Sequence, residues 1–547
     1  MSLKNKIIAG LAALALVGCG PTEEPKDYGD ISGVEEIAQP LAALATAPTF
    51  ASGTLTVVLA SGETAIISKH AVSGNILVND VATTGATSTA VKKIDITGHA
   101  TGTETLILDF ANGTFAPGIA SSAGIVAALG GGSDILKIRG AGATADAFVV
   151  GGTNQAIDIA FNVDAYKDIS VAATAALGGV TFSLGGGADT FTALTGANGT
   201  GGAAYTGDLT VYGGIGDDVL TGGDGDDTFY GDLGNDTLNG GTSNADSDVY
   251  NGGAGTDTVT YAARTLAIDV TVGAGADDGE TVAAETDDVK LDIEIVRGGS
   301  GADTFTGNTG DQTFYGGAGN DTFLMGLLAS TGAGNDTVYG EAGTDTVSYA
   351  ARIQAVTVTM DLNVANDGDA AGTETDNVRD DVENVICPTG AFACTVTGNA
   401  LDNTLTCGGG VDTFVGGAGD DTFVVGASNA GADVFTGGAG IDKMDFSAYG
   451  AVVTYVMDGT TAGTASKVIG ADIENFTCPS ASICTITGNA LNNRIYGSSA
   501  ADVIDAAGGD DFIEGVGGND DVTCGDGSDI WLKGAGTPTN TAADCEL

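Results

Sequence analysis

The chain is poor in the residues on which most enzymes and nucleic-acid-binding proteins depend. Among its 547 residues are two histidines, one tryptophan, and 18 lysines and arginines against 72 aspartates and glutamates. The formal charge of −54 argues against nucleic acid or anionic membrane surfaces as direct partners, because both would repel it. Only 8 prolines accompany the 90 glycines, which excludes a collagen or a proline-rich linker and favours repeated tight turns.

Familiar catalytic signatures are also missing. Neither H-E-x-x-H nor G-x-S-x-G occurs, and His70 and His99 lie in turn-like segments where a surface histidine is the simplest interpretation. We therefore expect a protein that is not an enzyme. The alternative is an extracellular polysaccharide-active enzyme that uses a pair of carboxylates within residues 50–210.

The N-terminus resembles a bacterial lipoprotein signal. Lys4 and Lys6 precede an apolar run, residues 7–17, that is too short to span a bilayer comfortably. The run ends in L-V-G-C, which resembles a lipobox and implies that Cys19 is lipidated. Residues 1–18 would then be the signal peptide and 19–49 a flexible tether. The resemblance implies an outer-membrane or cell-surface location, anchored by lipid and extracellular.

Export would permit disulfides among the remaining cysteines. Two close pairs occupy equivalent places in an internal repeat and are candidate disulfides: Cys387 with Cys394, and Cys478 with Cys484. Cys524 with Cys545 is a plausible C-terminal closure, but the pairing of these two and Cys407 stays open.

One nonapeptide recurs through the second part of the chain. From residue 213 it reads GGIGDDVLT, GGDGDDTFY and GDLGNDTLN, which is G-G-x-G-x-D-x-U-x with U apolar or aromatic. This pattern resembles the RTX, or haemolysin-type, calcium-binding repeat. It gathers in four blocks, within residues 211–272, 273–360, 361–457 and 458–547. The last three ranges also contain linking strands, and the last contains a C-terminal cap. We expect the linking strands to be longer ones that widen the solenoid.

The repeat predicts an all-β fold. Glycines at the first, second and fourth positions allow a tight turn with φ > 0, and the eighth residue alternates into the core as in a short strand. Two nonapeptides per turn give a parallel β-roll, or β-solenoid, in which like positions stack every 18 residues. Residues 50–210 show short β-type runs with few nonapeptides, so we expect a calcium-poor β-solenoid there, with a β-sandwich as the alternative.

The sixth-position aspartates are the candidate metal ligands. Hard oxygen ligands in flexible loops suit Ca²⁺ better than Mg²⁺, and soft ligands for zinc or copper are lacking. The family resemblance implies multiple Ca²⁺ ions, one between neighbouring turns on each side of the roll. The expected carboxylate ligands are Asp218, Asp227, Asp236, Asp248, Asp257, Asp303, Asp321, Asp336, Asp345, Asp412, Asp421, Asp433, Asp442, Asp502, Asp511, Asp520 and Asp529. Backbone carbonyls are expected near Gly214, Gly216, Gly223, Gly225, Gly234, Gly317, Gly319, Gly417 and Gly419.

Three repeats depart from the pattern. Gln312, Asn403 and Asn493 replace the aspartate, so we expect weak or absent sites there. The sequence as a whole predicts calcium binding by a surface-anchored structural or adhesive lipoprotein whose folding is coupled to Ca²⁺. Its expected partners are calcium, the membrane through the lipid on Cys19, and a cell-surface glycan or protein.

Overall fold

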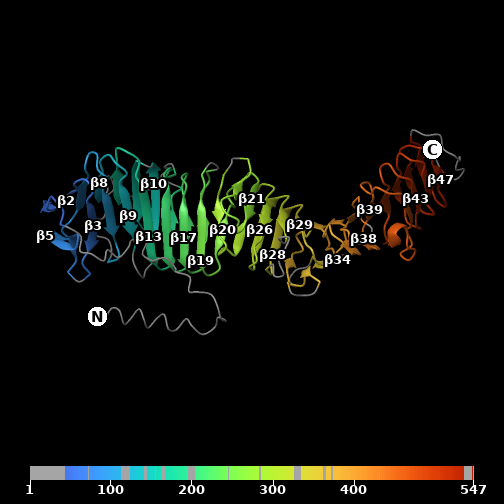
Figure 1. Cartoon of the computed structure of the whole chain (residues 1–547), viewed down its shortest axis with the longest axis horizontal. Helices are drawn as coiled ribbons and strands as arrows, with labels where there is room; N and C mark the ends of the chain where they lie inside the picture. Colours follow the sequence, from blue (N-terminus) through green and yellow to red (C-terminus); the bar gives the residue numbers. More distant parts are fainter. Residues whose placement is uncertain are drawn as a thin grey trace, which may run out of the picture.

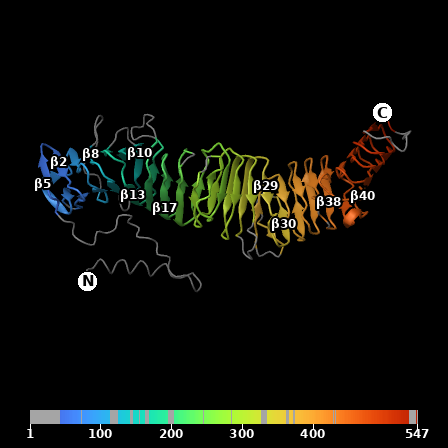
Figure 2. The same ribbon diagram turned by 45° about the horizontal axis from the view of Figure 1, so that its top comes forward.

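The computed structural model describes residues 43–534 and Cys545, apart from 72, 113–123, 141–144, 154, 162–167, 195–203, 244–245, 283–284, 326–333, 361–364, 371–373, 428 and 430. The predicted signal peptide, Cys19 and nearly all of the tether lie outside the described residues. The described chain forms one long rod of short strands stacked along a single axis (Figure 1). Its C-terminal part, from about β40 (Val453–Val456), is inclined to the rest (Figures 1 and 2).

The strands of the N-terminal third begin the rod. They are β1 (Thr49–Ala51), β2 (Thr54–Val58), β3 (Thr64–Lys69), β4 (Asn75–Val78), β5 (Val81–Thr87), β6 (Lys93–Thr97), β7 (Thr105–Asp109), β8 (Ile125–Ala128), β9 (Ile135–Arg139), β10 (Ala147–Thr153), β11 (Ala156–Phe161), β12 (Ile169–Ala172), β13 (Gly179–Gly186) and β14 (Thr190–Thr192). Most pair in parallel, and they share their two sheets with the repeat blocks that follow. The expected solenoid is therefore confirmed over the sandwich, but β3–β4–β5 and β10–β11–β12 add antiparallel pairs that the repeat pattern did not predict.

The first and second blocks continue both faces of the rod. Their strands, with the link between them, are β15 (Leu209–Ile215), β16 (Val219–Thr221), β17 (Thr228–Leu233), β18 (Thr237–Asn239), β19 (Val249–Ala254), β20 (Thr258–Thr260), β21 (Ile268–Thr271), β22 (Gly279–Glu280), β23 (Asp288–Val289), β24 (Ile295–Arg297), β25 (Thr304–Thr306), β26 (Thr313–Gly319), β27 (Thr322–Leu324), β28 (Thr337–Gly343) and β29 (Thr346–Ser348).

The remaining strands complete the third and fourth blocks. They are β30 (Val356–Thr359), β31 (Gly368–Asp369), β32 (Asn377–Val378), β33 (Asn384–Ile386), β34 (Cys394–Thr397), β35 (Thr404–Thr406), β36 (Thr413–Ala418), β37 (Thr422–Val424), β38 (Val434–Ala439), β39 (Lys443–Asp445), β40 (Val453–Val456), β41 (Val468–Ile469), β42 (Asn475–Thr477), β43 (Cys484–Thr487), β44 (Arg494–Tyr496), β45 (Val503–Asp505), β46 (Phe512–Glu514), β47 (Asp521–Thr523) and β48 (Ile530–Leu532). One 3₁₀ turn, Thr464–Ser466, lies in the third link.

The period of the repeat explains the register of these strands. Each repeat strand begins directly after the sixth-position residue, so its second residue is the apolar eighth one, which points inward. Leu220, Phe229 and Leu238 are completely buried. Thr210 pairs with Thr228, and Val219 with Thr237, so neighbouring strands of one sheet are two nonapeptides apart. The parallel β-roll built from these repeats is confirmed.

At each link, one of the two sheets of the roll ends and a new sheet begins, while the other sheet continues. In the first link β20 is followed by β21, which starts a new sheet, while β23 ends the 10-stranded sheet and β24 resumes the 15-stranded one. The same order recurs from β29 to β33 and from β39 to β42. These linking strands have only two to four residues. The expectation of longer strands that widen the solenoid is therefore wrong: the links keep one face of the roll and replace the other.

Three disulfides tie down the C-terminal half. Cys387 is bonded to Cys394 and Cys478 to Cys484, as predicted, and Cys524 is bonded to Cys545. Cys407 is the free cysteine of the described residues and is buried.

Candidate calcium sites

The sixth-position aspartates form rows that run along the rod. All those predicted as ligands are buried, with at most 4% of the residue exposed. One carboxylate oxygen, Oδ1, accepts the backbone N–H of the equivalent residue in the preceding turn. The bond from Asp218 N–H to Asp236 is 2.8 Å long, and so is the bond from Asp236 N–H to Asp257. The rows are therefore held in register by the backbone, one carboxylate above another.

The second oxygen, Oδ2, divides most of the loops into two kinds; Asp248 and Asp433 belong to neither, because their Oδ2 accepts a hydrogen bond from a side chain. In the open loops it is buried without a hydrogen-bond partner. The predicted ligands in open loops are Asp218, Asp236, Asp257, Asp321, Asp345, Asp421, Asp442, Asp511 and Asp529. In the closed loops Oδ2 accepts a backbone N–H of its own loop, usually that of the second residue: Gly223 to Asp227 at 2.8 Å, Gly299 to Asp303, Gly408 to Asp412 and Ser498 to Asp502.

Backbone conformation accounts for this division. In the open loops the second and fourth residues have positive φ, for example 108° at Gly214 and 136° at Gly216, which turns the second N–H away from the carboxylate. In the closed loop of Asp227, Gly223 and Gly225 do not have positive φ. Of the predicted carbonyl positions, Gly214, Gly216, Gly234, Gly317, Gly319, Gly417 and Gly419 thus belong to open loops, and Gly223 and Gly225 to a closed one. Positive φ, which the glycines of the pattern allow in every repeat, is therefore absent from the closed loops.

The open loops fit a calcium ion. Placed on Gly231, a Cβ atom would lie 2.2 Å from Asp236 Oδ2 and 2.4 Å from the carbonyl oxygen of Gly252 in the next turn. The space beside the first glycine is thus bordered by a carboxylate oxygen and a backbone carbonyl oxygen. A buried carboxylate oxygen with no donor is costly unless a cation satisfies it. Oxygen ligands alone, in a loop of this kind, suit Ca²⁺.

The electrostatics of the rows favour the same conclusion. Burial raises the pKa of Asp218 to about 7, and the neighbouring charges of Asp189 and Asp236 add to this effect. Burial likewise raises the pKa of Asp345 and of Asp421 to about 7, with further contributions from the acids stacked next to them. The rows therefore concentrate negative charge away from water, and a divalent cation would relieve both the burial and the repulsion.

The repeats without aspartate are satisfied without an ion. The Gln312 side chain accepts the Asn308 N–H at 3.0 Å and donates to the Asn308 side chain. Asn403 accepts the Asn399 N–H and donates to the Glu383 carbonyl oxygen. Asn493 makes the same two kinds of bond. These three side chains thus have partners within the protein, and the weak or absent calcium sites expected there stay a prediction.

The rows also include acids that the nonapeptide pattern does not contain. Each link ends in D-x-E, and its glutamate accepts the N–H of the last aspartate in a row: Glu294 from Asp257, Glu383 from Asp345 and Glu474 from Asp442. Toward the N-terminus, Asp189 N–H donates to Asp218 Oδ1 at 2.6 Å, and Glu104 N–H to Asp134 Oδ1. In the sequence, Asp189 lies in LGGGADTFT, a weak copy of the nonapeptide. The recurrence of D-x-E at the end of each link could have predicted the three glutamates.

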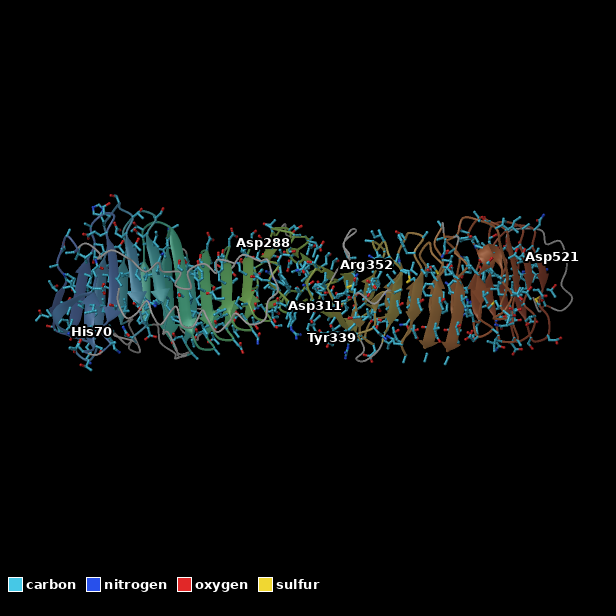
Figure 3. All side chains as sticks on the ribbon, turned by 60° about the horizontal axis from the view of Figure 1, so that its bottom comes forward. His70, Asp288, Asp311, Tyr339, Arg352 and Asp521 are labelled. Carbon is cyan, nitrogen blue, oxygen red and sulfur yellow. A yellow bond between two sulfur atoms is a disulfide. The ribbon has the colours of Figure 1, made fainter. Side chains whose placement is uncertain are left out.

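The two histidines are turn residues. His70, near the N-terminal end of the rod in Figure 3, accepts the N–H of Ser73 on Nδ1 at 3.1 Å. His99 Nδ1 accepts the N–H of Thr101. The alternative of a glycan-active site needs grouped carboxylates in a groove within residues 50–210. A hollow of about 460 Å³ lies in the first link, between Asn251, Lys290 and Asp292.

Comparison with known families identifies the repeats. A family model described as the RTX calcium-binding nonapeptide repeat matches residues 212–245, 242–259, 292–323, 329–351, 397–429, 427–444 and 487–522. The chain contains RTX calcium-binding nonapeptide repeats. These RTX repeats bind multiple Ca²⁺ ions, and the matches fall in all four blocks of the roll. No curated protein matches the chain.

Proposed function

We propose that this chain is a surface-anchored structural or adhesive lipoprotein whose RTX blocks take up Ca²⁺ at the open-loop aspartates as they fold. The observation that supports this most strongly is the set of buried, unpartnered Oδ2 atoms in register along the rod. Closed loops satisfy the same atom from their own backbone, so the open loops are the first to need an ion.

The energetics favour coupling between folding and calcium. A site at tenfold excess of ion over Kd adds about 1.4 kcal/mol to the folded state. The nine open loops named above would together add roughly 13 kcal/mol. Because whole domains are stable by only about 5–15 kcal/mol, this contribution decides whether the blocks fold. Since each turn contacts only its neighbours, folding should spread along the stack.

The extended shape of the rod suits a role at a cell surface. The rod holds its C-terminal end far from its N-terminal end (Figure 1), so a lipid on Cys19 would leave the distal blocks free to contact a cell-surface glycan or protein. Among the described residues, no helix has the length and apolar character of a membrane span. In this proposal the lipid provides the attachment.

Two experiments test the two halves of the proposal. For anchoring, Cys19→Ala should move the protein from the membrane fraction to the soluble fraction. An unchanged membrane fraction would contradict the lipid anchor.

For calcium, equilibrium dialysis of the full chain and of Asp236→Asn should show fewer bound ions in the variant. The control is Asp224→Asn, which removes one charge from an exposed position of a neighbouring repeat. Equal loss of calcium in both variants would contradict a specific role for the buried rows.

A further inference from the structure

Three cations of the chain are buried at the repeats that carry insertions. The Arg264, Arg352 and Lys467 side chains are 3%, 8% and 0% exposed. The nonapeptide register is interrupted within residues 240–248, 325–336 and 425–433, and each of these three loops receives one of the cations. Buried charges are costly to desolvate unless they are paired, and all three are paired.

Lys467 is surrounded by the oxygen atoms that would otherwise bind an ion. Its Nζ donates to the Gly431 carbonyl oxygen at 2.6 Å, to Asp433 Oδ2 at 2.7 Å and to Asn429 Oδ1 at 3.0 Å. These are a loop carbonyl, the second carboxylate oxygen of a repeat aspartate and an amide oxygen. In the open loops the equivalent Oδ2 has no partner; here the Lys467 ammonium group and the Asn429 amide each donate to it.

The two arginines enter their loops in a similar way. Arg264 donates to the carbonyl oxygen of Ser243, within the inserted loop, and its Nη2 donates to Glu285 at 2.6 Å. Arg352 donates from Nε to the carbonyl oxygen of Met325 at 3.0 Å and pairs with both oxygens of Glu374. Figure 3 places Arg352 near the middle of the rod, beside the second block.

The third link supplies its cation from a different position in the chain. The N–H of residue 264 donates to the Tyr261 carbonyl, that of 352 to Tyr349, and that of 449 to Phe446, so these three positions are equivalent. Position 449 is a tyrosine, and the arginine is therefore missing from the third link.

Lys467 takes the place of an acid. It directly precedes β41, whose first N–H donates to the Asp433 carbonyl. In the same way Asp287 precedes β23, which bonds to Asp248, and Asp376 precedes β32, which bonds to Asp336. The third link has thus lost an arginine and gained a lysine where the other links have an aspartate. The position of the cation has changed, but a cation still enters the inserted loop.

The fourth block provides an internal comparison. Its repeats run from 488 to 532 without an insertion, and its described residues contain no buried lysine or arginine. Buried cations therefore accompany the inserted loops and are not a general feature of the roll.

We infer that Arg264, Arg352 and Lys467 are built-in substitutes for calcium, so that the inserted turns hold together without the ion. This inference rests on the proposed function, in which the uninterrupted repeats depend on Ca²⁺. It assigns Asp433 to Lys467 and not to calcium while the lysine is present. At low calcium the turns next to the three links stay folded. Their strands then provide sheet edges on which the neighbouring turns can fold when calcium binds.

The test replaces the lysine in the full chain. Lys467→Met should bind one more Ca²⁺ than the wild type in equilibrium dialysis, since Asn429, Gly431 and Asp433 then face an open site. In chelator, hydrogen exchange at β38 should become faster, on the order of tenfold or more. Lys443→Met is the matched control, because Lys443 pairs with Asp445 with 34% of its side chain exposed, and it should change neither readout.

A second variant covers the case in which Lys467→Met does not fold. Tyr449→Arg with Ala465→Glu and Lys467→Asp supplies the arginine, its glutamate partner and the aspartate of the first two links. This triple variant should restore the wild-type calcium count and the protection of β38 in chelator. The inference is overturned if Lys467→Met matches the wild type in both readouts, or if it is unfolded and the triple variant does not restore it. A wild-type chain that binds no calcium would instead contradict the proposed function.

Discussion

Asp236→Asn should lower the stability of the first block in calcium but not in chelator. The asparagine oxygen can still accept the Asp218 N–H, which is 2.8 Å from Oδ1 in the native chain. The asparagine NH₂ group takes the place of Oδ2, which has no hydrogen-bond partner in the native chain and lies near the Gly252 carbonyl oxygen. The variant therefore keeps the backbone register, removes a carboxylate ligand, and removes one buried negative charge from the row.

The magnitudes follow from these two effects. With calcium at tenfold excess over Kd, losing one or both of the sites next to Asp236 costs about 1.4–2.8 kcal/mol. Without calcium the lost charge had been buried near Asp217, and burial had raised the pKa of Asp236 to about 6. At pH 7 its removal should then leave the block equally stable or more stable.

Hydrogen exchange at β17 and β18, measured with and without calcium, reports the stability of the first block in the variant and the wild type. Asp236→Asn should exchange faster than the wild type in calcium and no faster in chelator, while Asp224→Asn should match the wild type in both. Equal destabilisation in both conditions would mean that Asp236 acts only through packing, and the calcium account of the open loops would fail.

Three further predictions follow from the same geometry. In the folded chain the pKa values of Asp218 and Asp345 are raised from 3.8 to about 7. The calcium-free roll should therefore be most stable at low pH and lose stability as the pH rises through about 7. Circular dichroism melts in chelator that showed stability rising with pH would contradict this prediction. Gly231→Ala should remove one bound Ca²⁺, because its Cβ would lie 2.2 Å from Asp236 Oδ2, and an unchanged count in equilibrium dialysis would argue against that position. Replacing Cys387 and Cys394 by alanine should lower the unfolding free energy by about 2 kcal/mol, as for other short loops, with no change in calcium count; a changed count in dialysis would show that the bridge shapes a site.

Much of the fold could be predicted from the sequence because the repeat is strictly local. A nine-residue period places the aspartate before the strand and the apolar residue within it, so the burial of Asp218 and Leu220 follows from spacing alone. The disulfides within CPTGAFAC and CPSASIC followed from their closeness in sequence.

Other features depend on contacts that the period does not encode. The division into open and closed loops is set by φ at the second residue, and repeats with the same consensus fall on both sides. The change of sheet at each link depends on pairings between strands that are distant in sequence. In the first link, β23 pairs with β19 and β21 pairs with β25. Lys467 reaches Asp433 across 34 residues, outside the nonapeptide register, so nothing in the local pattern pointed to that pair.

A calcium titration of the mature chain, with Cys19 replaced by alanine, tests the central claim most directly. Circular dichroism and hydrodynamic radius should report a cooperative gain of β-structure and compaction at sub-millimolar to millimolar Ca²⁺, as for other extracellular calcium modules, and Mg²⁺ should not reproduce it. A chain that is fully folded and compact in chelator, with no further change on adding calcium, would contradict the account.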